Sequence, residues 1–143
     1  MKLVFEKSCG TILYTILDGT IHYLLIKSRD NSHCGFPKGH VEKAETERKT
    51  ALRETWEETS VNAKIVDGFR RDITYTLENG KKKMVVYFLA NYSGQTPQHN
   101  IGFEHNNYFL LPFDKAYAML SFENTKMLLV EANNFLKNKH KFF

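Results

Sequence analysis

Hydrophobic and polar residues alternate loosely along residues 3–17, and many of the side chains there are β-branched. This pattern is typical of a half-buried strand. An Asp-Gly turn signal follows, and the apolar run of residues 21–28 predicts a returning strand. Residues 29–44 are polar and contain one proline and two glycines, so we expect a long loop there.

A helix is predicted over residues 45–59, a run of good helix formers with neither glycine nor proline. Strand patterns return at residues 63–77 and 82–91, and the Asn-Gly pair between them is a strong hairpin signal. The remaining expected elements are a loop at 92–106, a short strand at 108–113 and helices at about 114–120 and 123–138.

The last predicted helix has an apolar face of the kind that docks on a sheet. Its members are Leu128, Leu129, Ala132, Phe135 and Leu136. Strands interleaved with two or three helices predict an α/β fold in which a mixed β-sheet is sandwiched between α-helices. The length of 143 residues favours one domain that spans residues 1–143.

Composition and charge exclude several classes of protein. The 42% hydrophobic and 25% charged residues are ordinary for a soluble globular chain. Cys9 and Cys34 form no C-x-x-C pair, so we expect neither a disulfide framework nor a zinc knuckle, and a reducing cytoplasm is the natural setting. Glu6 and Lys7 interrupt the first apolar residues, so we do not expect a signal peptide. No uninterrupted apolar stretch approaches roughly 18 residues, so we expect neither a membrane span nor a membrane partner.

The formal net charge of +4 suits a polyanionic ligand or RNA, although many small cytoplasmic proteins carry such a charge without a specific purpose. Candidate chemistry lies instead on the helix predicted at 45–59. Glu54, Glu57 and Glu58 fall within one arc of roughly 100°, and we expect Leu52 and Trp56 to point the other way, toward a core.

Three carboxylates on one helical face repel one another by a few tenths of a kcal/mol per pair. A magnesium ion relieves such repulsion, because it takes oxygen ligands from carboxylates and substrate phosphates. An isolated cluster of this kind is more often a solvated acidic face. The flanking residues favour the metal-binding interpretation here. They place six residues at fixed spacing: Gly39, Glu45, Arg53, Glu54, Glu57 and Glu58.

The segment from Gly39 to Val61 resembles the Nudix box, G-x5-E-x7-R-E-U-x-E-E-x-G-U, in which U is a bulky aliphatic residue. The four glutamates and the arginine of the box are present. Thr55 replaces an aliphatic residue, and Ser60 replaces the last glycine. That glycine usually ends the helix in the left-handed conformation, which a residue with a Cβ adopts at some cost.

The resemblance implies a role for each residue of the box. Glu54, Glu57 and Glu58 are expected to hold magnesium, or manganese in its place, and the backbone carbonyl of Lys38 is expected to add a ligand. Gly39 would let the backbone approach the metal and the phosphates.

Glu45 and Arg53 are expected to pair and brace the loop against the helix. Glu45 would also suit a helix N-terminus through the macrodipole alone. Water would attack one phosphorus of an anhydride while metal ions neutralise the developing charge. Glu58 and Glu54 are both candidates for the base that takes the proton, and Glu104, in a late loop, is a third candidate as base or metal ligand.

The flanks of the box resemble the asymmetrical diadenosine tetraphosphate hydrolases, a Nudix subfamily that yields ATP and AMP. The matching segments are FPKGHVE, Tyr75, Lys81 with Lys83, and FEHNNYFLL. Such a substrate needs cations and flat partners for its bases. The candidate cations are Lys38, His40, Lys81 and Lys83, and the candidate stacking residues are Tyr75, Tyr108 and His33.

Each flanking residue also has a plainer interpretation. The lysines at 81–83 equally suit a solvated hairpin end, Tyr75 equally suits an ordinary cross-strand aromatic, and Tyr108 equally suits a core residue. Many relatives carry tryptophan where this chain has Cys34, so a large stacking group is missing there.

The register of the predicted hairpin decides whether Tyr75 and Lys83 share a face. A two-residue loop would pair Tyr75 with Met84 and turn Lys83 to the other face. A three-residue loop would pair Lys83 with Leu77, on the face of Tyr75. We expect a small-molecule nucleotide substrate, no DNA, and a monomer or weak homodimer. The alternatives are an RNA 5′ pyrophosphohydrolase, which a basic chain also suits, and a catalytically silent Nudix-fold binding module.

Overall fold

A computed structural model describes residues 5–28, 33–96 and 106–140 of the chain. The strands are β1 (Phe5–Leu17), β2 (Thr20–Ser28), β3 (Cys34–Gly35), β4 (Lys38–His40), β5 (Lys64–Thr76), β6 (Lys82–Asn91) and β7 (Asn106–Pro112). The helices are α1 (Glu47–Thr59), α2 (Phe113–Met119) and α3 (Glu123–His140). The predicted strands and helices are therefore present, with ends displaced by a few residues at most.

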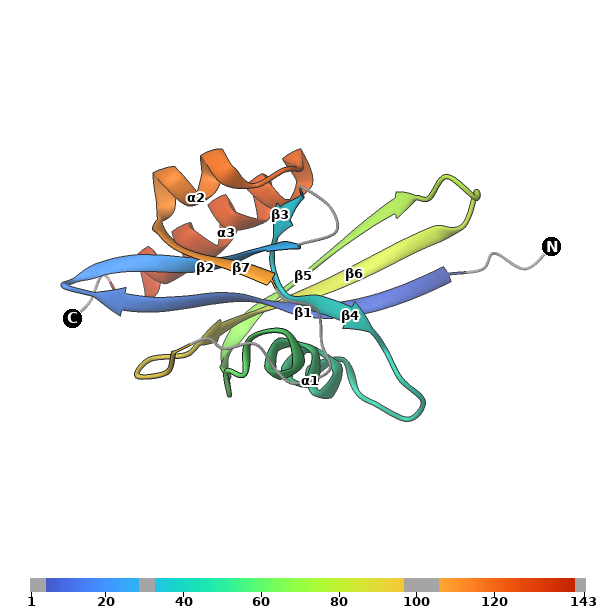
Figure 1. The fold of residues 1–143 in the computed structure, drawn as a ribbon, viewed down its shortest axis with the longest axis horizontal. Helices are drawn as coiled ribbons and strands as arrows, with labels where there is room; N and C mark the ends of the chain where they lie inside the picture. Colours follow the sequence, from blue (N-terminus) through green and yellow to red (C-terminus); the bar gives the residue numbers. More distant parts are fainter. Residues whose placement is uncertain (1–4, 29–32, 97–105, 141–143) are drawn as a thin grey trace.

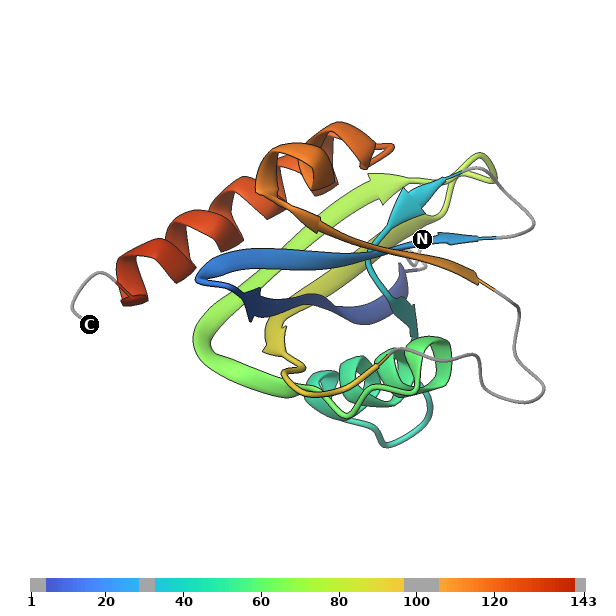
Figure 2. The same cartoon turned by 60° about the vertical axis from the view of Figure 1, so that its left-hand side comes forward.

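The strands form one mixed sheet in the order β3-β2-β1-β6-β5, with β4 paired to β1 and β7 paired to β2. The β1–β6 pair is parallel, and the other pairs are antiparallel. Helix α1 covers one face of the sheet, and α2 with α3 covers the other (Figure 1). Figure 2 shows α3 running obliquely along that second face. The predicted α/β sandwich is confirmed.

Helix α3 docks through the face that the sequence predicts. Leu128, Leu129, Ala132 and Leu136 are buried, and Phe135 packs against the same core. These side chains join aliphatic and aromatic residues of β1, β2 and β6 in the largest cluster of the core. No helix in the described ranges is long and apolar enough to cross a membrane.

The loop predicted for residues 29–44 is wrong in part, because β3 and β4 lie inside it. Each is two or three residues long and pairs with a longer strand, β3 with β2 and β4 with β1. Strands this short carry no alternating pattern of their own. Gly10 makes the close approach of β4 to β1 possible, because a Cβ there would lie 2.1 Å from the Pro37 carbonyl oxygen.

Helix α1 meets the sheet through small and polar residues. Its buried side chains are Thr50, Ala51, Thr55 and Thr59. The prediction that Trp56 points toward a core is wrong, since its side chain is 44% exposed. The hydroxyls of Thr11 and Thr55 share a hydrogen bond of 2.7 Å, and Thr59 donates to the Thr55 carbonyl. Hydrogen bonds thus replace the apolar packing that the hydrophobic residues of α1 suggested.

The β5–β6 hairpin pairs Tyr75 directly with Lys83. The Leu77 amide donates to the Lys81 carbonyl, and Gly80 takes a φ of 84° in the three-residue connection. Neither predicted register is therefore correct. Directly opposed residues share a face of the sheet, so Tyr75 and Lys83 do lie on the same side.

Candidate active site

Helix α1 carries the acidic face and has a defined start and end. The Thr46 hydroxyl accepts a hydrogen bond from the Lys49 amide, as an N-cap does. At the other end Ser60 adopts the left-handed conformation, with φ 61° and ψ 19°, and its amide donates to the Trp56 carbonyl at 2.7 Å. The helix therefore ends in a left-handed residue without glycine, at a cost of about 1 kcal/mol.

Arg53 is the centre of an ion-pair cluster beside this face. Its guanidinium binds both carboxylate oxygens of Glu45, at 2.7 and 2.9 Å. The Nη1 atom donates to Glu54 at 2.8 Å and to Glu57 at 3.2 Å, and Nη2, which also binds Glu45, donates to the His40 carbonyl. The Arg53 bond holds the pKa of Glu45 at about 2. The arginine thus joins the loop before α1 to the helix itself.

Gly39 lies against the carboxylate of Glu54. A Cβ on Gly39 would sit 2.0 Å from the Glu54 carboxyl carbon, so a residue with a side chain there would displace the Glu54 carboxylate from its position. Burial raises the pKa of Glu54, and the bond from Arg53 opposes that rise. Because Gly39 pairs with Cys9 in the sheet, β4 brings its backbone directly to the acidic helix.

Glu58 is the most perturbed carboxylate of the cluster. Burial and the nearby Glu54 raise its pKa to about 8, while the ammonium and the backbone of Lys38 act in the opposite direction. The Tyr108 hydroxyl donates to the backbone carbonyl of Glu58 at 2.6 Å. A buried carboxyl of this kind favours a proton, or a cation, close to it.

Two lysines come together next to Glu58. The pKa of Lys38 is lowered by burial and by the adjacent Lys83 ammonium, whereas Glu58 and Glu54 raise it. Lys83 stands opposite the half-buried Tyr75. Two neighbouring ammonium groups beside an aromatic ring attract a polyanion that carries a flat base. Lys81, by contrast, is exposed at the hairpin end, opposite Leu77.

The remaining predicted residues lie at the edges. His40 is exposed, with its Nε2 4.0 Å from a Glu6 carboxylate oxygen. The exposed ring of His33 lies 4.8 Å, centroid to centroid, from Phe122. Phe122 is 50% exposed and is not among the residues predicted from the sequence. Its only sequence signal is an aromatic residue in the polar turn before α3.

Glu104, a candidate base or metal ligand, and Cys34, which replaces the tryptophan of many relatives, complete the predicted positions. Glu104 lies outside the described residues. Cys34 is buried, and two hydrogen bonds join its backbone to Ser121. The Cys34 amide donates to the Ser121 hydroxyl at 2.8 Å, and the Ser121 amide donates to the Cys34 carbonyl at 3.2 Å. The segment that leads to β4 is therefore fixed to the turn between α2 and α3, which carries Phe122.

The donor chemistry of the acidic face fits a hard divalent cation. Three carboxylates of α1 and the backbone of β4 offer oxygen ligands, and the absence of a side chain at Gly39 lets the Glu54 carboxylate lie directly against the β4 backbone. Within the described ranges, no three His, Cys, Asp or Glu side chains already meet around one point. Arg53 holds Glu54 and Glu57 instead, so the guanidinium supplies positive charge to this face.

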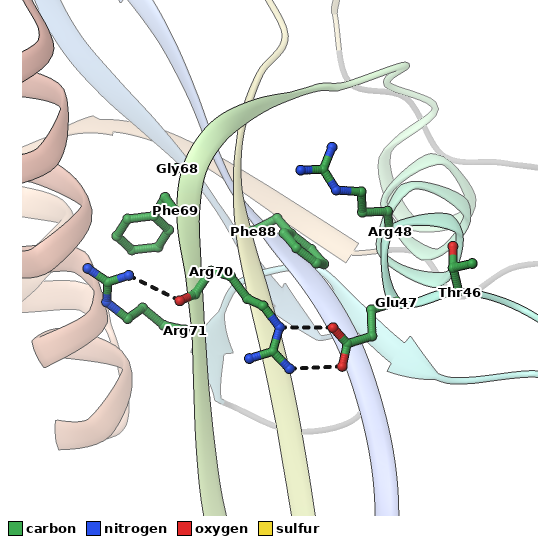
Figure 3. A pocket seen from close by; sticks show the side chains of 8 residues that line it. All are labelled: Thr46, Glu47, Arg48, Gly68, Phe69, Arg70, Arg71 and Phe88. Carbon is green, nitrogen blue, oxygen red and sulfur yellow. Dashed lines mark hydrogen bonds and ion pairs between the residues drawn. The ribbon is translucent and has the colours of Figure 1, made fainter.

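The start of α1 is held in a different way, around an open pocket of about 620 Å³ (Figure 3). Arg70 of β5 binds both oxygens of Glu47 at 2.9 Å and one oxygen of Asp72 at 2.9 Å. Lys7 adds a contact to Glu47 at 2.7 Å. Two cations and two carboxylates thus make up this ion-pair cluster, which ties the helix start to the sheet, and Arg48 and Arg71 also line the pocket.

Comparisons with known proteins agree on one family. The NUDIX domain model matches residues 10–131. The chain is 35% identical, over 91% of its length and 95% of the relative, to the bis(5′-nucleosyl)-tetraphosphatase [asymmetrical] of Rattus norvegicus. It is 30% identical to an RNA pyrophosphohydrolase of Roseobacter denitrificans, over 73% of this chain and 72% of that protein.

A solved structure with the same fold is a binary complex of the Caenorhabditis elegans Ap4A hydrolase. It superposes with a TM-score of 0.85 at 29% identity, and the match covers 93% of this chain and 98% of that one.

Proposed function

Since the chain belongs to the Nudix family, we propose that it hydrolyses a phosphoanhydride bond of diadenosine tetraphosphate and releases ATP and AMP. The observation that carries this proposal is the meeting of two groups of opposite charge. The carboxylates of α1 lie directly beside the Lys38–Lys83 pair. A substrate with several phosphates is one that both groups can engage, through cations on one side and ammonium groups on the other.

Nudix hydrolases generally use divalent metal ions, and we propose magnesium, with manganese as a substitute. Glu54, Glu57, Glu58 and the Lys38 carbonyl would hold it. When bound, the metal would neutralise charge on the phosphates and lower the pKa of a water molecule. Arg53 keeps Glu54 and Glu57 beside one another, and Gly39 leaves Glu54 open to the cation.

The other steps belong to side chains of this protein. Lys38 and Lys83 bind phosphate oxygens, and Tyr75 stacks against a base. Glu58, which lies beside Lys38 on the acidic face of α1, is the proposed acceptor for the proton of the attacking water. Glu45 and Arg53 hold the loop against α1.

A second candidate is the 5′ triphosphate end of RNA, which the similarity to an RNA pyrophosphohydrolase favours. RNA differs from the dinucleotide in length, since an RNA chain would extend beyond the Lys38–Lys83 pair. Its binding would therefore weaken steeply as the salt concentration rises. We further propose a cytoplasmic protein with reduced, buried Cys9 and Cys34 that acts as a monomer or weak homodimer, without DNA or a membrane as partner.

Chromatography of the reaction products tests the proposed function. The protein is incubated with magnesium and diadenosine tetraphosphate, and in parallel with triphosphorylated RNA, a nucleotide sugar and an oxidised nucleoside triphosphate. Equal amounts of ATP and AMP from the first substrate, at the highest rate of the set, support the proposal. Two ADP molecules per substrate would contradict the asymmetric cleavage, and a higher, salt-sensitive rate on RNA would favour the second candidate.

A further inference from the structure

Thr11 is bonded to both halves of the candidate site. It lies in the middle of β1 and is fully buried. Its amide donates to the Pro37 carbonyl at 3.1 Å, next to Lys38 in the chain. Its hydroxyl bonds the hydroxyl of Thr55 at 2.7 Å, next to Glu54 on α1. One residue therefore connects the strand that approaches the acids to the helix that carries them.

Apart from the ion pairs of Glu47 and Arg53 and the Tyr108 bond to Glu58, α1 meets the sheet through a packed surface of small side chains. Its buried side chains are one alanine and three threonines, and its tryptophan is exposed. Small side chains interlock less than large ones, so a helix on such a surface can shift with little loss of packing. A buried hydrogen bond is directional and costly to leave unmade, which opposes rotation of the helix.

The tolerance of the site to such a shift is small. Glu54 precedes Thr55, and Glu58 follows it by about one helical turn, so both carboxylates move with this residue. Functional groups must be held to within roughly 0.5 Å, and a displacement near 1 Å in an enzyme site can cost on the order of 100-fold in rate.

We propose that Thr11 is a positioning residue that acts through Thr55 and sets the spacing between the Lys38–Gly39 strand and the carboxylates of α1. This role rests on the proposed cation site at Glu54 and Glu58. It is distinct from the box itself, because Thr11 lies outside the box and Thr55 occupies a position where an aliphatic residue is usual.

Valine tests the hydroxyls with little change of shape. The variants are T11V, T55V and the double variant T11V/T55V, in which neither partner is left with an unmade bond. Thr55→Ser keeps the hydroxyl and removes the methyl group. Thr15→Val is the matched control, because Thr15 is a buried threonine of the same strand and face, and its hydroxyl lies near Ser93 rather than α1.

Binding of Mn²⁺ alone, measured by the electron paramagnetic resonance signal of the free ion, is the primary measurement. We expect T11V/T55V to bind Mn²⁺ about 10-fold more weakly than the wild type, as for other residues that orient metal ligands. The T55S and T15V variants should stay within about twofold, since T55S retains the bond. Melting temperatures and kcat/KM on diadenosine tetraphosphate are measured alongside.

Unchanged Mn²⁺ affinity in the folded double variant would overturn the proposal and leave the bond a purely structural one. If the double variant does not fold, the T55S and T55V pair decides, since valine must lose affinity that serine retains. A wild-type protein that binds Mn²⁺ but leaves the dinucleotide intact would refute the proposed function alone. A wild type that binds no Mn²⁺ would overturn the positioning role as well.

Discussion

Two arginines bind the acidic residues of α1, and they do so in different electrostatic settings. Arg53 contacts four carboxylates, those of Glu42, Glu45, Glu54 and Glu57, with its own side chain 22% exposed. Arg70 is 43% exposed and contacts two carboxylates, Glu47 and Asp72, while Lys7 shares Glu47 with it.

The difference separates a functional cluster from a structural one. Around Arg70 the charges cancel, and the ion pairs join α1 to β5 as surface pairs do. Around Arg53 the carboxylates outnumber the cations, and Glu58 adds one more whose pKa is raised by burial. An uncompensated acidic excess lowers stability, and a bound divalent cation would relieve it.

The largest effect on activity is expected when a carboxylate of the Arg53 cluster, where acids outnumber cations, is neutralised. Glu58→Gln should lower kcat by about 10²–10⁴-fold, because the variant loses a proposed proton acceptor and metal ligand. The protein should remain folded, since glutamine has nearly the same shape. The same change in the Arg70 cluster, where the charges cancel, is Glu47→Gln, and it should leave kcat within about twofold of the wild type. Steady-state kinetics on the two variants checks the contrast, and equal losses would contradict it.

The second largest effect is expected when each arginine is replaced by lysine, because activity should fall in the Arg53 variant and not in the Arg70 variant. Lysine cannot reproduce the two-pronged contact of Arg53 with Glu45 while also reaching Glu54. Arg53→Lys should therefore reduce activity about 10–100-fold, as loss of a group that orients metal ligands does. Arg70→Lys should keep its activity. A wild-type kcat/KM for Arg53→Lys would show that the bridging geometry is dispensable.

Stability should respond at the end of the helix. Ser60→Gly removes the cost of a Cβ in the left-handed conformation, so we expect a gain of about 0.5–1 kcal/mol and a melting temperature higher by a few degrees. Thermal denaturation followed by circular dichroism measures this gain. A lower melting temperature would mean that Ser60 makes a contact worth more than the strain.

The smallest expected effect is the pH dependence of the stability that Glu47 contributes in the Arg70 cluster. The bonds from Arg70 and Lys7 lower the pKa of Glu47 from its ordinary 4.5 to about 2. This stabilisation is full above about pH 4.5 and is lost as the pH falls through 2. The stability difference between wild type and E47Q, at most about 1 kcal/mol at pH 7, should therefore vanish near pH 2. Urea unfolding at several pH values checks it, and a constant difference would refute it.

Much of the site was predictable, because its residues are close in sequence. Arg53 and the four box glutamates lie on one helix and the loop before it, so spacing alone indicates a shared function. The lysine and aromatic partners come from other strands. Their meeting depends on the hairpin register, which a left-handed Gly80 sets by extending the turn to three residues.

The orientation of α1 was not predictable from hydrophobicity. Trp56 is the largest apolar residue of the helix and was expected inside, yet threonines are buried there in its place. They can be buried because each finds a hydrogen-bond partner, such as Thr11, which is distant in sequence. Single-sequence patterns do not contain such pairings, and they missed β3 and β4 for the same reason.

Calorimetric titration of magnesium into the wild type, Glu54→Gln and Glu47→Gln tests most directly whether the acidic excess around Arg53 is a cation site. The account predicts saturable binding to the wild type and to Glu47→Gln with equal affinity, and binding at least about tenfold weaker to Glu54→Gln. Equal affinity of all three proteins, or weakened binding in Glu47→Gln alone, would contradict it.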